Sequence, residues 1–313
     1  MTGIKRFMGI AAIAFGLLLT LGSGAAFADS DGTLYIDGRQ ADLQLWIRDE
    51  TAYIPVKELA DRMGWDLSYD GESDRIAVRN AWGDELALRI GRSVVAYNGK
   101  AYEIAQAVKL RGGSAYAPLR VVAEAMHVGV GWRAEDRAFD VRTEEPYSVA
   151  SGDTLASIAE EHGTTAQELK IRNGLESDAV EAGQRLKVLM PAFADPAAVD
   201  AALLAKIVEI EAGNEPYEGK LAVANVVLNR VHSGKFPDTI RGVIFAPGQF
   251  PPAGKGMLET ETASGDSLKA AQAALSGENN VPGALYFFNP KLEPDKARKA
   301  DAVKKIGSHL FVR

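Results

Sequence analysis

The stretch Leu203–Arg230, LLAKIVEIEAGNEPYEGKLAVANVVLNR, predicts two helices joined by a short polar connection. Upstream of the connection, apolar residues recur at helical spacing and lead directly into Glu211. Gly213 and Asn214 are helix stop signals, and Pro216 suits the first turn of a second helix. A carboxyl group at the end of a buried helix is partly desolvated, so its pKa rises and it keeps a proton near neutral pH. The pattern leaves two interpretations of Glu211 open: a general acid that faces a groove, and a solvated glutamate at a helix end.

The composition of the whole chain limits the classes of function. A length of 313 residues, with 47% hydrophobic and 25% charged residues, is ordinary for a protein of two or three globular domains. The absence of cysteine excludes disulfides and a thiol nucleophile. A net charge of −7 argues against nucleic acid as a partner, because phosphate binding requires a basic face.

The N-terminus predicts a secretory signal peptide over residues 1–28. Lys5 and Arg6 precede the apolar run Phe7–Leu21, and Ala26-Phe27-Ala28 is a small-x-small cleavage site. The alternative is an uncleaved N-terminal anchor. No later segment has the length and hydropathy of a membrane span, so we expect a mature chain without one. The expected location is outside the cell, at the cell wall or the spore envelope, after cleavage near Ala28.

Residues 33–143 contain an internal repeat. The segment AYIPVKELADRMGWDLSYD, from Ala52, recurs as AYAPLRVVAEAMHVGVGWR, from Ala115. Each copy predicts a strand that ends at proline, a helix and two further strands. The segment resembles the N-terminal stalk domain named after copper amine oxidases. Its single imidazole, His127, is a poor copper site without Cys or Met partners. A spacer, a wall-binding module and a plain structural domain remain open as its role.

Residues 146–191 form a compact unit with the order strand, helix, helix, strand. Ser151 or Asp153 is expected to cap the first helix, and Thr164 or Thr165 the second. The segments GDTL, NGL and GQ-L-V resemble the LysM family, which binds peptidoglycan. The resemblance implies glycan contacts from the two loops beside the helices, with Leu155 and Leu175 as an apolar floor; Asp153 and Thr154 could instead serve only as a cap. The implied contacts are Gly152, Asp153, Thr154, Leu155, Ile171, Asn173, Gly174 and Leu175.

The remaining chain is expected to hold a linker at residues 192–199 and a domain at residues 200–313. After the two opening helices, Asp238 is expected to cap a short helix, and Pro251–Thr262 is expected to be a surface loop beside the groove. The further elements predicted are a helix over Thr239–Phe245, a helix over Asp266–Leu275, a strand over Ala284–Phe288 and a basic amphipathic helix over Asp295–Ile306.

The residue types of this domain favour carboxylate chemistry. Its two histidines, His232 and His309, lack the spacing of a zinc site and are interpreted as surface or structural residues. A Cys–His peptidase is excluded, and no G-x-S-x-G turn is present. Glycosidases commonly use two carboxylates, but none of the nearby Glu209, Glu215 and Glu218 is clearly placed as a partner of Glu211.

Residues 198–313 resemble the SleB/CwlJ-type cell wall hydrolases through four segments. These are IEAGNEPYEGKLAVANVVLNRV, FPDTIRGVIFAPGQF, ALYFFNP and IGSHLFVR. The resemblance implies a mainly helical, lysozyme-like domain and a lytic transglycosylase in which a single glutamate acts. Glu211 matches that glutamate, which protonates the glycosidic oxygen after MurNAc and then assists attack by the C6 hydroxyl of the same sugar. Gly213-Asn214 and Glu209 depart from the residues that are usual in the family.

Six further residues are candidates for substrate binding in this domain. Glu215 could lie in the groove or act only at the start of a helix. Gln249 and Asn289 follow turn signals and suit hydrogen bonds to N-acetyl groups, or serve the turns alone. Phe250 and Tyr286 could stack on sugar rings or belong to the core, as could Phe288.

We therefore expect a multidomain α+β protein that is secreted and cleaves the GlcNAc–MurNAc strands of peptidoglycan, in the spore cortex or the vegetative wall. The expected partner is the peptidoglycan strand, with no nucleic acid, cofactor or metal. The alternatives are a hydrolytic muramidase, an N-acetylmuramoyl-L-alanine amidase and a non-catalytic wall-binding protein.

Overall fold

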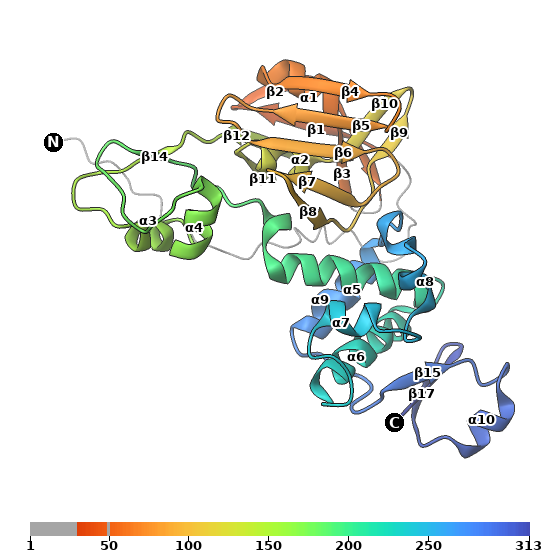
Figure 1. The fold of residues 1–313 in the computed structure, drawn as a ribbon. Coiled ribbons are helices and arrows are strands. Elements are labelled where there is room, and N and C mark those ends of the chain that lie inside the picture. The colour runs from red at the N-terminus through yellow and green to blue at the C-terminus, as the bar shows by residue number, and fades with distance from the viewer. Residues whose placement is uncertain (1–29, 49–50) are drawn as a thin grey trace.

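The computed structural model describes residues 30–48 and 51–313, so the predicted signal peptide lies outside the described residues. The chain forms a β-rich N-terminal domain, a small middle module with two helices and a mainly helical C-terminal domain (Figure 1). This is the α+β organisation that the sequence predicts. No helix within the described ranges is long and apolar enough to cross a bilayer.

The N-terminal domain contains a seven-stranded sheet, a five-stranded sheet and two helices. The larger sheet has the order β11-β12-β1-β2-β3-β10-β9, and the smaller one runs β4-β5-β6-β7-β8. The strands are β1 (Ser30–Ile36), β2 (Arg39–Arg48), β3 (Thr51–Pro55), β4 (Asp66–Asp70), β5 (Arg75–Arg79), β6 (Glu85–Arg89), β7 (Val94–Tyr97), β8 (Lys100–Glu103), β9 (Lys109–Arg111), β10 (Ser114–Pro118), β11 (Val128–Arg133) and β12 (Ala138–Thr143), and the helices are α1 (Val56–Met63) and α2 (Leu119–Ala125).

The two copies of the repeat pair with each other in the larger sheet. Strands β3 and β10 are antiparallel, with Ile54 opposite Ala117 and Tyr53 opposite Pro118. Ile54 and Ala117 occupy equivalent positions in the two copies, so the two strands are related by an approximate twofold axis at this pair. Helices α1 and α2 follow the proline that ends each strand, as predicted, because proline suits the start of a helix but cannot donate to a sheet.

The middle module has the predicted βααβ order: β13 (Tyr147–Ser148), α3 (Leu155–Glu161), α4 (Ala166–Asn173) and β14 (Arg185–Leu186). Thr165 caps α4, as predicted. The cap of α3 is Thr154, whose hydroxyl accepts from the Ser157 N–H, so the expectation of Ser151 or Asp153 is wrong. Asp153 instead accepts hydrogen bonds from the Tyr147 hydroxyl and the Ala150 N–H.

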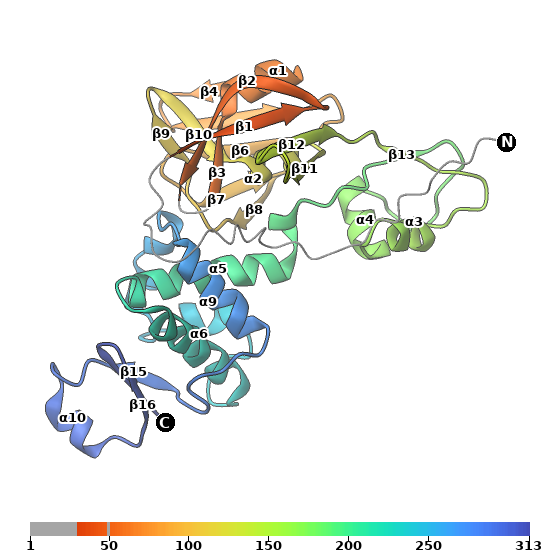
Figure 2. The ribbon, with the colours of Figure 1, turned by 180° about the vertical axis from the view of Figure 1, so that it is seen from behind.

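The C-terminal domain is built around two long helices, α5 (Pro196–Ala212) and α6 (Tyr217–His232). Their apolar faces form one core with the shorter helices. Figure 2 shows α9 beside α5 and α6. The shorter elements are α7 (Ile240–Phe245), α8 (Pro251–Gly254), the 3-10 turn η2 (Met257–Glu259) and α9 (Gly265–Leu275). Thr239, and not the predicted Asp238, caps α7, because its hydroxyl is placed to accept from the Gly242 N–H.

The last 28 residues differ most from the prediction. The expected helix over Asp295–Ile306 is a single turn, α10 (Pro294–Lys299), followed by strand β16 (Ala302–Ile306). Strand β16 turns at Gly307 and pairs with β17 (His309–Val312), which also pairs with β15 (Tyr286–Phe288). The predicted amphipathic pattern rests on few apolar residues, and pairing with the apolar β17 satisfies the backbone of this segment instead.

The N-terminal domain docks onto the side of the C-terminal domain formed by α5 and the segment before α9. The Ser93 N–H donates to the Glu259 carbonyl (2.7 Å), and the Ala263 N–H donates to the Ala105 carbonyl (3.1 Å). The ammonium group of Lys206, a fully buried residue of α5, bonds to Glu103 at 2.7 Å. The expected surface loop at residues 251–262 is therefore mostly helical and serves as a docking segment.

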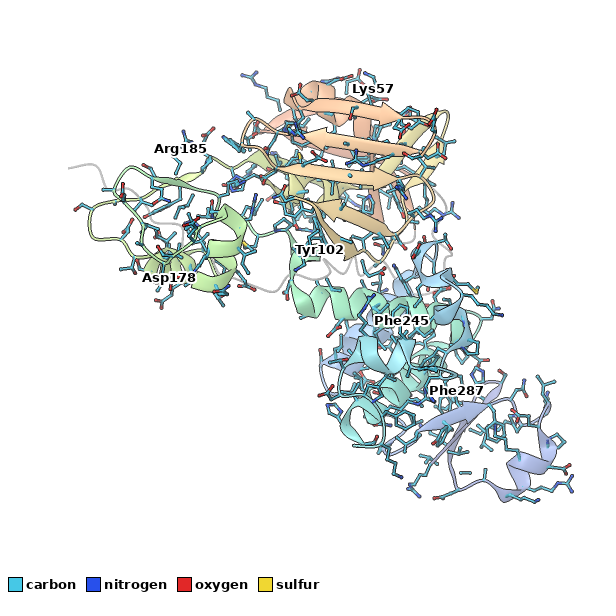
Figure 3. The ribbon with its side chains drawn as sticks, viewed as in Figure 1. Lys57, Tyr102, Asp178, Arg185, Phe245 and Phe287 are labelled. Atoms are coloured by element: carbon cyan, nitrogen blue, oxygen red, sulfur yellow. The ribbon has the colours of Figure 1, made fainter. Side chains whose placement is uncertain are left out.

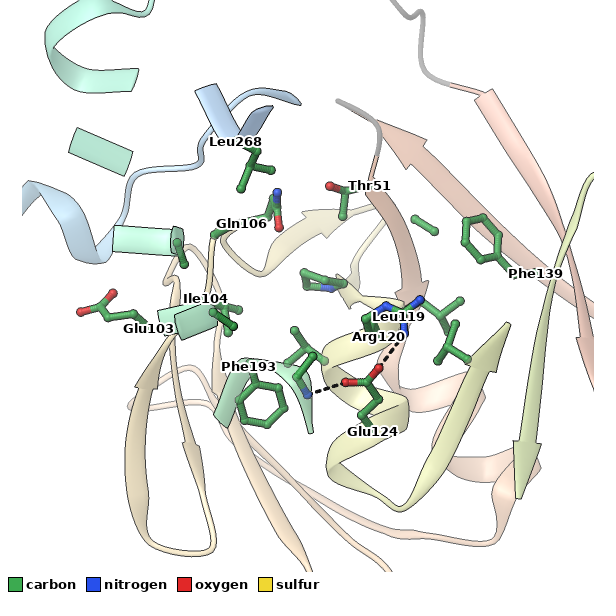
Figure 4. Close-up of a pocket in the computed structure, with 18 of the residues that line it drawn as sticks. Thr51, Glu103, Ile104, Gln106, Leu119, Arg120, Glu124, Phe139, Phe193 and Leu268 are labelled. Carbon is green, nitrogen blue, oxygen red and sulfur yellow. Dashed lines mark hydrogen bonds and ion pairs between the residues drawn. The ribbon is translucent and has the colours of Figure 1, made fainter. Parts of the chain in front are cut away.

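The expected linker at residues 192–199 is also part of this packing. It forms the 3-10 turn η1 (Ala192–Ala194) and the first turn of α5. The ring of Phe193 is 8% exposed and packs into the N-terminal core, and the Ala192 N–H donates to Glu124. A cavity of about 270 Å³ lies here between the two domains (Figure 4).

The middle module is joined to the N-terminal domain through a buried carboxylate. Asp84, which is inaccessible to solvent, accepts two hydrogen bonds from Arg172 (2.6 and 2.9 Å) and one from Lys187 (2.8 Å). Burial would raise the pKa of Asp84, but the bonds from Arg172 and Lys187 outweigh it and hold the pKa well below its usual value. His127 adds a second tie, because its Nε2 accepts from the Leu189 N–H.

Candidate active site

Glu211 lies in the last turn of α5 and is partly buried. Among the residues that the structure describes, none makes a hydrogen bond or an ion pair with its carboxyl group. Burial raises the pKa of Glu211, and the positive charge of Arg230 opposes that rise. The result is a carboxyl group that is free to exchange a proton and has an increased tendency to hold one, which is the property expected of a general acid.

Arg230 projects from α6 into a cage of aromatic rings. Its guanidinium carbon lies 5.1 Å from the ring centre of Phe236, 5.0 Å from that of Phe250 and 5.6 Å from that of Tyr286. The residue is 5% exposed, and its Nε donates to the Leu285 carbonyl at 2.8 Å. Its buried Nη1 has no hydrogen-bond partner among the described residues. A cation held so firmly near Glu211 can stabilise the carboxylate after the proton has left.

The carboxylate of Glu209, two residues earlier on α5, is held by hydrogen bonds within the domain. Its Oε2 accepts from the Ser264 N–H (3.0 Å) and the Ser267 hydroxyl (2.6 Å), at the start of α9. Burial would raise the pKa of Glu209, but these hydrogen bonds and the Lys220 ammonium group at 4.0 Å hold it below the usual value. Glu209 is therefore an ionised side chain that fixes α9 to α5.

The carboxylate of Glu215, at the connection between α5 and α6, is also held by hydrogen bonds. Its carboxylate accepts from the N–H and the hydroxyl of Ser308, in the turn between β16 and β17. Partial burial would raise the pKa of Glu215, but the bonds from Ser308 and the nearby His309 lower it overall. Glu215 thus holds the β-hairpin against the helices beside Glu211.

The other candidates of this domain separate into two groups. Phe250 and Tyr286 meet at Arg230; Phe250 is 4% exposed, whereas Tyr286 is 44% exposed and can meet a ligand. Gln249 is partly buried in the turn after α7, and the carboxamide oxygen of Asn289 accepts from the Lys291 N–H. Only Tyr286 therefore presents a large exposed surface next to the Arg230 cage. Phe288, the third aromatic candidate, is buried.

Two residues of this arrangement, Arg230 and Phe236, were missed by the sequence analysis. A single arginine within an apolar helix was the available signal, because a buried charge must find partners. The large cavity of Figure 4 is lined by residues such as Gln106, Leu119 and Phe193 and contains none of the predicted site residues. In the ranges that the structure covers, no group of three or more His, Asp or Glu side chains could hold a metal ion.

The predicted glycan contacts of the middle module lie on two neighbouring loops. Gly152, Thr154 and Gly174 are exposed, and Ile171 is 67% exposed. The side chain of Leu155 is 1% exposed in the module core, so it cannot supply the expected apolar floor; Leu175 is partly buried. The Asn173 carboxamide donates to the Leu169 and Lys187 carbonyls and accepts from the Lys187 N–H.

Comparison with known families matches all three parts of the chain in order. Residues 35–141 match the copper amine oxidase N-terminal domain, and residues 147–189 match the LysM domain. Residues 214–312 match the family described as Cell Wall Hydrolase. The C-terminal domain is thus similar to cell wall hydrolases. The matched segment begins three residues after Glu211, so the role of that residue rests on its own geometry.

Relatives of this cell wall hydrolase domain include a protein described as spore cortex-lytic enzyme from Bacillus cereus. It is 40% identical over 115 residues, which cover 36% of this chain and 44% of the relative. The chain thus spans less than half the length of that relative. A crystal structure of the catalytic domain of the Bacillus cereus SleB protein is 40% identical, covers 36% of this chain and 89% of that one, and has a TM-score of 0.34. The catalytic domain of the germination-specific lytic transglycosylase SleB from Bacillus anthracis is 38% identical over 36% of this chain and 93% of that one, with a TM-score of 0.34.

Proposed function

We propose that this protein cleaves the glycan strands of peptidoglycan as a lytic transglycosylase in which Glu211 is the single acid and base. The observation that carries the proposal is the contrast among three neighbouring carboxyl groups. Glu211 has no partner among the described residues and a raised pKa, whereas Glu209 and Glu215 are tied into hydrogen bonds that lower theirs. Neither neighbour is free to act as a second catalytic carboxylate.

The proposed reaction proceeds in two steps at the bond after MurNAc. Protonated Glu211 gives its proton to the glycosidic oxygen, and the C1–O bond breaks to leave an oxocarbenium-like centre at C1. The Glu211 carboxylate then takes the proton of the C6 hydroxyl of the same sugar as the hydroxyl oxygen bonds to C1. The products are a 1,6-anhydro end and a free hydroxyl on the leaving sugar, and Glu211 is again protonated. No water is consumed.

The predicted secretion and wall location belong to the same proposal. The LysM module would bind the glycan through its two exposed loops, with the backbone of residues 152–155 and 173–175 and the exposed side chain of Ile171 facing the sugar. The N-terminal domain would hold this module and the hydrolase domain at a fixed distance. Gln249, Phe250, Tyr286 and Asn289 remain candidates for substrate contact, and Tyr286 is the most exposed of the aromatic pair.

The products of digestion test the reaction. Residues 29–313 are incubated with purified peptidoglycan, and the new ends are identified by mass spectrometry. We expect 1,6-anhydro-muramic ends. Reducing muramic ends would show that water is the acceptor, as in a muramidase. Released peptides with intact glycan would show an amidase, and no product at all would support a binding protein.

A further inference from the structure

The C-terminal 25 residues carry a charge opposite to that of the rest of the hydrolase domain. Residues 289–313, here called the basic lobe, contain seven lysine or arginine residues and three acidic ones. Residues 200–288 contain seven basic and ten acidic residues. The lobe comprises α10, β16 and β17 and projects from the helices on the side away from the N-terminal domain (Figures 1 and 3).

The three acidic residues of the lobe are neutralised within it. Each forms an ion pair with a nearby basic residue, so three of the seven positive charges are balanced. The pairs are Glu293–Lys296 (3.1 Å), Asp295–Arg298 (2.8 Å) and Asp301–Arg313 (3.4 Å). The other four basic residues are Lys291, Lys299, Lys304 and Lys305. They are exposed, and their ammonium groups form no ion pair within the part of the chain that the structure describes.

The base of the lobe is fixed to the α5–α6 connection, which follows Glu211 in the chain. Ser308 bonds to Glu215 at the α5–α6 connection, and Gly307 lies so close that an added Cβ would meet the Glu215 carboxylate at 1.8 Å. Tyr286, on the strand that pairs with β17, stacks on Arg230. Lys304 and Lys305 precede the Gly307 turn by only two or three residues. The unpaired positive charges therefore begin close to the turn that contacts Glu215, four residues after the proposed catalytic Glu211 in the sequence.

We propose that the basic lobe binds the carboxylates of the peptides attached to the glycan strand while Glu211 acts on the glycan itself. This inference rests on the proposed function, because it needs a peptidoglycan strand at Glu211. The peptides carry free carboxylates and leave the strand at its muramic residues, where the bond is cut. Exposed lysines on flexible stems can follow such mobile anions without requiring one fixed geometry.

Two sets of substitutions test the lobe. One variant changes Lys291, Lys299, Lys304 and Lys305 to Gln; the control changes Lys57, Lys100, Lys235 and Lys255 to Gln, which removes the same charge elsewhere on the surface. Cleavage is measured on native peptidoglycan, on peptidoglycan whose carboxylates have been amidated, and on peptidoglycan treated with hydrofluoric acid to remove wall phosphates. Melting temperatures verify that both variants are folded.

We expect the lobe variant to lose about tenfold in kcat/KM on native peptidoglycan at low salt. The control variant should match the wild type. Amidation should slow the wild type by a similar factor and leave the lobe variant unchanged, whereas removal of phosphate should have no effect on the difference. Equal rates for the lobe and control variants would overturn the inference, as would a difference that disappears with the phosphates.

A parallel digestion with Glu211→Gln distinguishes a failure of the proposed function from a failure of the inference about the basic lobe. If the wild type cuts the glycan and this variant does not, the proposed function stands and the lobe is tested on its own. If the wild type leaves the glycan intact, the proposed function fails first, and the inference about the lobe fails with it.

Discussion

At the scale of single residues, Glu211 has no partner among the described residues, whereas the neighbouring carboxyl groups hold elements of the domain together. Glu209 and Glu215 lie within four residues of Glu211 and have the same chemistry, yet each is held by serine donors from a different element. The sequence predicted Glu211 from its position at a helix end. It could not distinguish the partners of its neighbours, because Ser264 and Ser308 come from distant segments.

Arg230 should control the pH dependence of cleavage. Burial raises the pKa of Glu211 and the Arg230 charge lowers it, so removal of that charge should raise it further. In the proposed reaction the free enzyme needs protonated Glu211, so the alkaline limb of the kcat/KM profile should move to higher pH in Arg230→Met. Arg230→Lys, which keeps the charge, should move it less.

Arg241 provides the control for this prediction. It also stacks on an aromatic ring, with its guanidinium carbon 4.7 Å from the centre of the Phe245 ring, but it is exposed on α7. Arg241→Met should leave the alkaline limb in place. If Arg230→Met lowers the rate without moving the limb, Arg230 has a packing role and no electrostatic one.

At the scale of elements, the β-hairpin of the basic lobe is tied to the helices by the contact between Glu215 and Ser308, in addition to the packing of Ile306 and Phe311 in the helical core. Gly307→Ala should destabilise the lobe, because the new Cβ would displace the Glu215 carboxylate from Ser308. Loss of these charge-assisted bonds should cost about 1–3 kcal/mol in the free energy of unfolding, measured with urea.

Gly256→Ala is the matched control. Gly256 has a similar left-handed backbone (φ +72°, against +54° at Gly307), but an added Cβ would meet nothing within 4 Å. It should therefore show the cost of backbone strain alone. Equal losses for the two variants would mean that the contact with Glu215 contributes nothing.

The same hairpin is the part of the fold that the sequence did not predict correctly. The repeat, the βααβ module and the helix pair carry strong local signals, such as prolines at strand ends and threonine caps, and the structure has these elements where they were expected. Residues 295–306 carry weak local signals. Their conformation is set by pairing with β17, a contact that no local pattern records.

At the scale of the whole molecule, the domains are packed together rather than tethered. Lys206, on the helix that carries Glu211, is completely buried against Glu103 of the N-terminal domain. This packing has no signal in the sequence, since Pro191–Val199 has the composition of a linker. Its Phe193 side chain finds a place in the neighbouring core only in three dimensions.

Glu103→Gln should destabilise the protein strongly. The change leaves the Lys206 cation buried without its counter-charge, which typically costs about 3 kcal/mol. The Arg92–Glu259 pair crosses the same interface at 3.2 Å but is exposed, so Arg92→Gln should cost under about 1 kcal/mol. Urea unfolding of the two variants measures the difference, and similar costs would show that burial of Lys206 is not maintained in solution.

The junction between the N-terminal domain and the LysM module should weaken in acid. The folded pKa of Asp84 is depressed, so its stabilising effect is complete above the unfolded pKa and declines as the pH falls below about 4. The difference in unfolding free energy between the wild type and Asp84→Asn should therefore shrink on acidification. The control, Asp61→Asn, removes an exposed partner of Lys57 and should show a small difference at every pH. A constant gap for Asp84 would contradict the buried ion pair.

The most direct test of the account compares three variants on one substrate: Glu209→Gln, Glu211→Gln and Glu215→Gln, each assayed for release of glycan fragments from purified peptidoglycan after its folding has been verified. The account predicts that Glu211→Gln loses at least about a thousandfold in kcat, while the folded fractions of the other two variants retain most of theirs. Substantial activity in Glu211→Gln would contradict it. So would an equal loss in a folded Glu209 or Glu215 variant, because a second carboxylate would then take part in the chemistry.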